Sequence, residues 1–394
     1  MSLELSKKNS VLSNSDIREY YMNRFILSIM FSWIFLSCTG LDEAMVYAAA
    51  RGDKAKILNL VDKGGNINGR DRFGRTAIFM AASGGHKDIV ELLLDKGVKV
   101  NATDKNGFTA LHGAVSVGRV DIVNLLMSRG ANVNATSTNG STVLHWAGKY
   151  PAVIKLLLKK GARPGVKSKY MGTPLNLYAN LGYNKSITIL IAHGANIESV
   201  DINGHTALQN AAEKGHLKTV KLLISKGANM EATDRYFRTP VKLAAYNGHL
   251  SCVKLLVKKG AKLNPGRGSA LHSAAYTGRL KVIKYLLSIG MDINELDDGG
   301  NPPLLLVPLN KLELISYLIK KGADVKLTGN TGWTILHKLV YANSIKLVTL
   351  VIQKGAPVNA RISFGQDKGK TPLDLARGEE MRRLLLKHGA KSGN

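Results

Sequence analysis

The chain has 394 residues, with 55 Lys and Arg against 28 Asp and Glu, and a formal net charge of +27 at pH 7. Two cysteines cannot build a disulfide framework, and neither has the spacing of a metal-ligand set. The length alone would predict two or three globular domains. The basic excess predicts attraction to acidic proteins, anionic lipid surfaces or nucleic acid.

The first distinctive stretch is residues 22–38, MNRFILSIMFSWIFLSC, which follows a polar segment of mixed charge at 1–21. A basic residue (Arg24), an apolar run and a small residue are typical of a secretory signal. We therefore expect a signal peptide over 22–37, with Met22 as the start and residues 1–21 as an extended or non-native leader. The run is also near the lower length limit for a spanning helix, so a signal anchor stays open, as does a buried helix.

Cys38 follows the apolar run almost directly, and the segment therefore resembles a bacterial lipoprotein signal peptide. That resemblance implies cleavage before Cys38, lipidation of Cys38, and membrane attachment in the periplasm or at the outer membrane. Phe35 and Leu36 depart from the usual pattern, which has Leu followed by a small residue. A cytoplasmic location is the alternative.

The rest of the chain repeats itself. Residues 104–136 read DKNGFTALHGAVSVGRVDIVNLLMSRGANVNAT, and residues 71–103 and 201–233 are copies of the same length. A recurring glycine sets the register of the whole array, at Gly64, Gly97, Gly130, Gly161, Gly194, Gly227, Gly260, Gly290, Gly322, Gly355 and Gly389. A fixed period in this range is typical of a solenoid, which forms one continuous domain.

Each copy predicts a turn, a short helix and a second helix. In residues 104–136 the turn is 104–107, the first helix 109–117 and the second helix 120–128. Ile122, Val123, Leu125 and Leu126 form an apolar stripe at helical spacing. Two short helices cannot bury their apolar faces alone, so neighbouring copies must stack.

In chain order, residues 38–70 hold the lipidation site and an N-terminal capping helix pair, and residues 71–394 hold about ten repeats. Residues 71–266 are the most regular part. The third repeat is two residues short near Tyr150 and Pro151, and the seventh, 267–296, lacks most of its turn. Prolines in the eighth repeat predict a short first helix. Residues 362–394 form the C-terminal cap.

The T-x-L-H-x-A pattern at this period resembles the ankyrin-repeat family. The resemblance implies an all-α solenoid of stacked helix-turn-helix units with protruding turns. It also implies a non-catalytic monomer that binds a protein partner through a concave face of turns and first helices. The pattern histidines, His112, His145, His272 and His337, are then structural, and we expect no cofactor and no metal site.

Candidate partner-binding residues are the large aromatic and basic side chains on the turns and first helices, which have no core to fill there. Aromatics and arginines dominate interaction hot spots. The predicted residues are Arg72, Phe73, Arg75, Lys105, Phe108, Lys169, Tyr170, His205, Arg235, Tyr236, Phe237, Arg238, Tyr246, Tyr276 and Trp333. Because the seventh repeat lacks its turn, we expect the main contact region within residues 71–266.

The alternative function is binding of a polyanion, either nucleic acid or an anionic lipid surface. Lysines concentrate at the ends of the second helices, where they also complement the helix dipole. The expected protein partner is acidic. Lipidation of Cys38 would favour a membrane surface over nucleic acid, whereas a cytoplasmic location would make nucleic acid more favoured. Nucleic acid is a possible partner but not the favoured one.

Overall fold

The computed structural model describes residues 40–264 and 266–393, and all regular structure in these ranges is helical. The only β-type pairs there are four isolated bridges at turns. The chain divides into two compact units, residues 1–207 and 208–394. The expected signal segment 22–37 and Cys38 lie outside the described residues.

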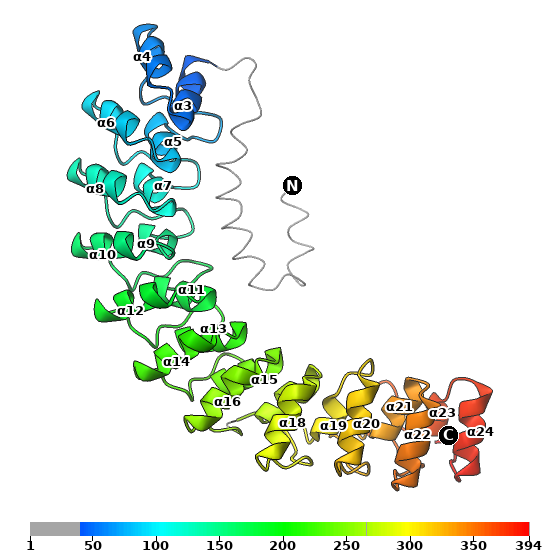
Figure 1. The fold of residues 1–394 in the computed structure, drawn as a ribbon. Coiled ribbons are helices and arrows are strands. Elements are labelled where there is room, and N and C mark those ends of the chain that lie inside the picture. Colours follow the sequence, from blue (N-terminus) through cyan, green and yellow to red (C-terminus); the bar gives the residue numbers. More distant parts are fainter. Residues whose placement is uncertain (1–39, 265, 394) are drawn as a thin grey trace. The chain divides into compact units, whose positions relative to one another are not determined.

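In the first unit, a first helix and a second helix alternate along the chain and form two rows (Figure 1). The first helices are α3 (Leu41–Arg51), α5 (Ala77–Gly84), α7 (Ala110–Ser116), α9 (Val143–Trp146) and α11 (Pro174–Leu181). The second helices are α4 (Lys54–Asp62), α6 (Lys87–Asp95), α8 (Val120–Ser128), α10 (Pro151–Lys159) and α12 (Asn184–Ala192).

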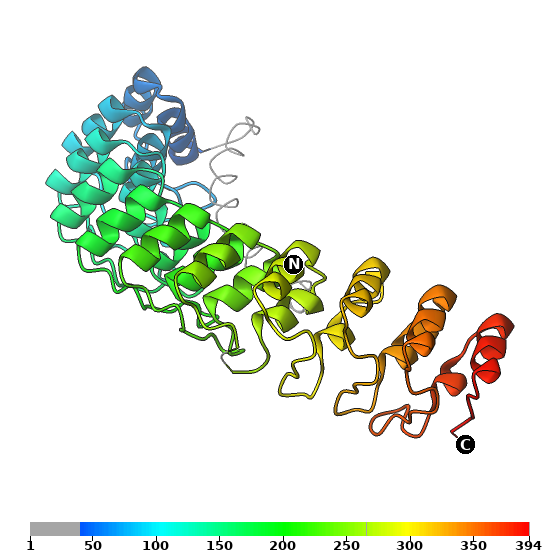
Figure 2. The same ribbon diagram turned by 60° about the horizontal axis from the view of Figure 1, so that its bottom comes forward.

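The second unit continues the same alternation, and in Figure 2 its turns project on one side of the helices. The first helices are α13 (Ala207–Lys214), which begins at the division, α15 (Pro240–Asn247), α17 (Ala270–Tyr276), α19 (Pro303–Leu306), α21 (Ile335–Tyr341) and α23 (Pro372–Leu375). The second helices are α14 (Leu217–Ser225), α16 (Leu250–Lys258), α18 (Leu280–Ser288), α20 (Leu312–Lys320), α22 (Ile345–Gln353) and α24 (Glu379–Lys387). The expected all-α solenoid is confirmed.

The repeat of α7 and α8 shows why these residues form these elements. Thr109 is extended and caps α7, so the first helix begins one residue later than the sequence predicted. Helix α8 has the predicted bounds, and Ile122, Val123 and Leu126 are fully buried. Each register glycine follows the second helix with φ between 78° and 95°, a conformation that favours glycine. The apolar stripe and the glycine stop therefore define the second helix.

Three of the first helices, α9, α19 and α23, have only four residues, and for α9 and α19 the following repeat compensates for the loss. Helix α9 has four residues, and its Leu144 carbonyl accepts a hydrogen bond from the phenol of Tyr178 in α11. Helix α19 also has four residues, because Val307 is extended and Pro308, which has no N–H, follows it. The Lys338 amine of α21 donates to the carbonyls of Leu305 (2.6 Å) and Val307 (3.3 Å). The predicted short helix of the eighth repeat is confirmed.

Candidate functional site

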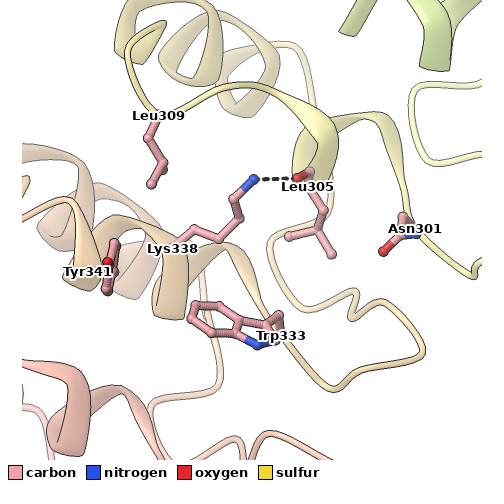
Figure 3. Close-up of a pocket in the computed structure, with 6 residues that line it drawn as sticks. All are labelled: Asn301, Leu305, Leu309, Trp333, Lys338 and Tyr341. Atoms are coloured by element: carbon pink, nitrogen blue, oxygen red, sulfur yellow. Dashed lines mark hydrogen bonds between the residues drawn. The ribbon is translucent and has the colours of Figure 1, made fainter. Parts of the chain in front are cut away.

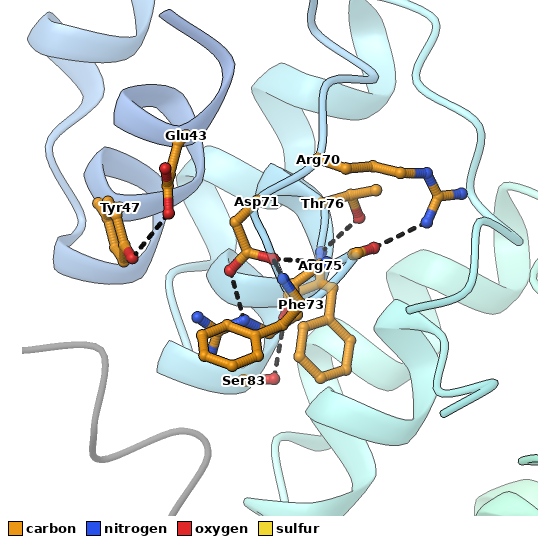
Figure 4. A network of polar contacts seen from close by, with 10 residues as sticks. Glu43, Tyr47, Arg70, Asp71, Phe73, Arg75, Thr76 and Ser83 are labelled. Atoms are coloured by element: carbon orange, nitrogen blue, oxygen red, sulfur yellow. Dashed lines mark hydrogen bonds and ion pairs between the residues drawn. The ribbon is translucent and has the colours of Figure 1, made fainter. Parts of the chain in front are cut away.

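The turns share one internal geometry, which decides which of their side chains face solvent. In the turn 71–75, the Asp71 carboxylate accepts from the backbone N–H of Phe73 (2.9 Å) and of Arg75 (2.8 Å). The Arg75 guanidinium turns back and donates to the same carboxylate (2.6 Å; Figure 4). Both side chains are almost fully buried. Arg72 and Phe73 in the middle of the turn are therefore exposed, whereas its first and last residues are packed.

This geometry makes the expected exposure wrong for three candidate residues. Arg75, Phe108 and His205 each close a turn with a backbone N–H on the turn aspartate, and each is buried. Phe108 packs edge-on against Trp146 of the next repeat, with ring centroids 5.3 Å apart. Phe108 therefore packs between repeats.

The remaining turn candidates keep surface exposure. Phe73, Tyr236 and Phe237 are 47%, 70% and 45% exposed. Basic side chains lie over these rings: Arg72 over Phe73 (4.9 Å to the centroid) and Arg238 over Tyr236 (5.0 Å). Among the other candidates, Arg72, Lys105, Lys169 and Arg235 are exposed, and Tyr170, which lies under Lys169, and Arg238 are half-buried. The turns therefore present aromatic rings paired with cations.

A second set of exposed aromatics lies at the ends of first helices in the second unit. Tyr246 and Tyr276 stack with ring centroids 6.1 Å apart, and Tyr276 is 57% exposed. Each lies seven residues after the residue that caps its helix, Thr239 or Ser269. Tyr341 has the same place after Thr334, is 49% exposed, and lies under the Arg377 guanidinium (4.8 Å). The sequence analysis missed Tyr341, although this common spacing could have found it.

Trp333 lines a hollow of about 350 Å³ with Leu305, Leu309, Lys338 and Tyr341 (Figure 3). The indole is half-buried, with its ring 5.8 Å from the imidazole of His337. The hollow lies where the last turns of a full-length first helix would stand in the repeat of α19. Burial lowers the pKa of Lys338, and its amine is already engaged by two carbonyls. The hollow therefore follows from the truncated helix.

The pattern histidines complete the helix caps, as the family resemblance implied. The Thr142 N–H donates to Nδ1 of His145 (3.0 Å), so Nε2 carries the proton and donates to the carbonyl of Gly172 in the next turn (3.0 Å). Burial lowers the pKa of His112, His145 and His337 to about 4. In the fourth repeat, the Asn176 amide makes the equivalent bonds, accepting from the Thr173 N–H (3.0 Å) and donating to the carbonyl of His205 in the next turn (3.2 Å). This position therefore requires a side chain that can accept a hydrogen bond from the helix cap and donate one to the next turn, and an imidazole is not essential.

Other chemistry has little support in the described residues. No group of three His, Cys, Asp or Glu side chains there could hold a metal ion. No helix among them is long and apolar enough to cross a bilayer. Cys252 is a buried core residue, and burial raises the pKa of its thiol to about 11, which keeps it protonated.

Paired short helices, capped by Thr and stacked in two rows with projecting turns, define an α-solenoid of the helix-turn-helix repeat class. The ankyrin-repeat family model matches residues 45–137, 144–234, 233–297 and 304–393, and the chain belongs to that family. Ankyrin repeats are in general protein–protein interaction modules and are typically not enzymes.

The chain is similar to segments of several proteins. A putative ankyrin repeat protein of fowlpox virus is 34% identical over 109 residues, which cover 26% of this chain and 32% of the relative. Rabankyrin-5 of Homo sapiens is 36% identical over 84 residues, which cover 21% of this chain and 7% of the relative. The nuclear factor NF-kappa-B p105 subunit of Gallus gallus is 32% identical over 114 residues, which cover 28% of this chain and 11% of the relative. The chain thus spans a third or less of each of these relatives.

Proposed function

We propose that this solenoid is a non-catalytic scaffold that binds a protein partner through its turns and the exposed ends of its first helices. The observation that carries the proposal is the repeated exposure of large aromatic rings at equivalent places in different repeats. Scattered exposed aromatics are ordinary, but Phe73 and Tyr236 share the third position of a turn, and Tyr276 and Tyr341 share the position seven residues after a helix cap. Guanidinium groups lie over the rings of Phe73, Tyr236, Phe237 and Tyr341. The rings are Phe73, Tyr236, Phe237, Tyr276 and Tyr341.

The chemistry of this surface favours an acidic partner with apolar side chains. Exposed rings supply contact area at low cost in conformational entropy, and arginines add charge-assisted hydrogen bonds. The surface extends past Gly266 to Tyr276 and Tyr341, beyond the region that the sequence favoured. We expect the main contact to include both sides of that position.

The test is affinity capture with the full chain and with the triple variant Tyr246→Ala, Tyr276→Ala, Tyr341→Ala. We expect the variant to keep its helical content and to lose a captured protein at least about tenfold, since hot-spot truncations cost 2 kcal/mol or more. A matched control is Tyr285→Ala, which changes a tyrosine on the second helix α18. Equal loss in the control, or no loss in the triple variant, would argue against this surface.

Polyanion binding is the second candidate, favoured by the lysines at the C-terminal ends of the second helices. Lys160, Lys226, Lys259, Lys321 and Lys354 each cap such a helix and are exposed. A polyanion site predicts binding of oligothymidylate or phosphatidylserine vesicles. For oligothymidylate, a single strand, the logarithm of the affinity should fall by about 0.7 for each neutralised phosphate per decade of salt. Capture that persists at high salt and depends on the tyrosines would favour the protein partner.

For location, we propose export and attachment to a membrane through a lipid on Cys38. The support is the sequence of residues 22–38 alone. Since α3 begins at Leu41, such a lipid would hold this end of the solenoid close to the bilayer. The test is the mass of the N-terminal peptide of the native protein from separated membrane and soluble fractions. A chain that starts at Cys38 with added acyl mass supports the proposal, and an unmodified start at Met1 or Met22 in the soluble fraction contradicts it.

A further inference from the structure

Phe237 occupies a position where six other turns have glycine. It is the fourth residue of the turn that begins at Asp234, and its φ is 59°. Asn343 is the only other residue besides glycine with positive φ in the described residues. A bulky side chain in this region of backbone space is strained. The corresponding residues in other turns are Gly74, Gly107, Gly140, Gly204, Gly300 and Gly332.

The neighbouring turn explains why glycine is needed elsewhere. A Cβ on Gly74 would lie 3.0 Å from the backbone nitrogen of Lys105, and one on Gly107 would lie 2.8 Å from that of Thr138. Adjacent turns are also hydrogen-bonded, as the Thr138 N–H donates to the Asn106 carbonyl (2.9 Å). After Phe237 the seventh repeat lacks its turn. A Cβ built on Gly266 would still be 3.8 Å from the Phe237 Cβ. The shortened repeat therefore makes room for a side chain at residue 237.

Packing does not account for the strained phenylalanine that uses this room. Phe237 is 45% exposed and its neighbour Tyr236 is 70% exposed. The Arg267 guanidinium lies over the Phe237 ring (4.7 Å), and Arg238 lies over the Tyr236 ring (5.0 Å). Asp234 orients Arg238 through a hydrogen bond of 2.8 Å. Strain kept at an exposed position is a feature of binding sites.

The charges around this turn indicate what would bind. Arg235 and Arg267 are exposed, and neither has a carboxylate partner in the described part of the chain. A guanidinium covers one face of each ring, so a nucleobase can stack only on the opposite face, whereas an apolar side chain can also pack against the ring edges. A carboxylate can bind the edge of a stacked guanidinium without displacing it. The arrangement therefore favours an acidic peptide over a nucleic acid.

We propose that Tyr236 and Phe237, with Arg235 and Arg267, form an anchor site for an acidic peptide segment of a partner protein. An apolar side chain of the segment lies against the two rings, and flanking Asp or Glu carboxylates pair with the two arginines. The strained backbone at Phe237 presents the ring in place before the peptide binds. This inference rests on the proposed scaffold function and specifies one site within it.

The experiment selects random displayed peptides on the full chain and measures their Kd on three single-residue variants. We expect selected peptides to contain Asp or Glu next to an apolar residue. Phe237→Gly should raise their Kd about tenfold or more while the thermal midpoint stays the same or rises, because glycine relieves the backbone strain. Arg267→Gln should raise the Kd as well. The matched control is Phe364→Ala, which removes a 73% exposed aromatic ring that belongs to neither proposed surface and should leave the Kd unchanged.

Each other result has a distinct meaning. Peptides that bind Phe237→Gly as tightly as the unmodified chain would overturn the anchor site and leave the scaffold function standing if the triple tyrosine variant still loses them. A fall in the thermal midpoint of Phe237→Gly would assign the ring a packing role and overturn the anchor. Selection of no acidic peptide, with oligothymidylate binding that depends on Phe237, would overturn the anchor and favour nucleic acid.

Discussion

Two turns of nearly identical sequence differ in what they do. In the first unit the turn 71–75 reads DRFGR, and in the second unit the turn 234–238 reads DRYFR. Both use the aspartate to bind the last arginine. The Arg75 side chain is 2% exposed whereas that of Arg238 is 30% exposed, and glycine in one turn is an exposed phenylalanine in the other. The difference follows from the neighbouring repeat, since the first turn has a full turn packed on it and the second does not. A deletion in one repeat can therefore change a structural turn of the preceding repeat into accessible surface.

The largest expected effect breaks the buried ion pair of the first turn. Arg75→Ala leaves the Asp71 carboxylate buried without its guanidinium, which should cost about 3–5 kcal/mol of unfolding free energy. Arg238→Ala, the matched change in the second unit, should cost less, because water can reach the Asp234 carboxylate through the space that the partly solvated Arg238 side chain leaves. Urea unfolding of both variants checks the difference. Equal losses would mean that the two turns are energetically alike.

The next effect exchanges the residue that distinguishes the turns. Gly74→Phe places a side chain against the Lys105 backbone and forces it to a φ near 77°. Overpacking and backbone strain together should cost about 3 kcal/mol. The thermal midpoint of Gly74→Phe should therefore fall, in contrast to that of Phe237→Gly. A well-folded Gly74→Phe would show that the neighbouring turn moves easily, and would remove the basis of the comparison.

A smaller effect concerns acid stability and the histidine bridges. His145 has a folded pKa of about 4, below its unfolded value near 6.5, so its contribution to stability is full above pH 6.5 and is lost as the pH falls toward 4. Between pH 7 and pH 5 this loss is about 2 kcal/mol for one such histidine. His145→Asn introduces the residue that the fourth repeat has at this position, Asn176. The variant should lack the part of the pH-dependent stability loss that is due to His145. Unfolding at the two pH values checks it, and an unchanged pH dependence in the variant would place the acid sensitivity elsewhere.

The smallest expected effect is on folding stability at the exposed tyrosines. Tyr276→Ala removes a 57% exposed ring that stacks on Tyr246, and should change the unfolding free energy by no more than about 1 kcal/mol. Phe73→Ala in the first unit should have a similarly small effect. Thermal unfolding checks both changes. A loss of several kcal/mol at Tyr276 would mean that this ring stabilises the array rather than a complex.

The sequence predicted the repeat architecture well because the elements depend on local chemistry. The second helix at 120–128 agrees with α8, since an apolar stripe and a following glycine determine its bounds. The short first helix of the eighth repeat follows from Pro303 and Pro308, which act on the backbone directly. Residues 1–39 lie outside the described structure, so the lipoprotein hypothesis for Cys38 is untested.

The candidate surface was harder to predict because turn residues differ in orientation. The last turn residue donates its N–H to the turn aspartate, and this bond directs the side chain inward at Arg75, Phe108 and His205. Exposure of Phe237 depends on the missing turn of the seventh repeat, some thirty residues later. The residues close to Phe237 in the sequence do not indicate it. Tyr341 could have been found by counting from the helix cap.

The hydrogen bonds at the ends of the truncated helices α9 and α19 set an order in which the repeats can finish folding during synthesis. The ribosome synthesises the N-terminal residues first. The Leu144 carbonyl of α9 can accept its hydrogen bond only after Tyr178, 34 residues further along the chain, has been synthesised. Likewise the Leu305 carbonyl of α19 waits for Lys338, 33 residues later. At about 5–20 residues per second, each carbonyl stays without its partner for roughly 2–7 s of synthesis. The short helices α9 and α19 thus obtain these hydrogen bonds only from the repeat that is synthesised after them. We therefore expect folding of the nascent chain to be delayed at α9 and at α19, while synthesis continues.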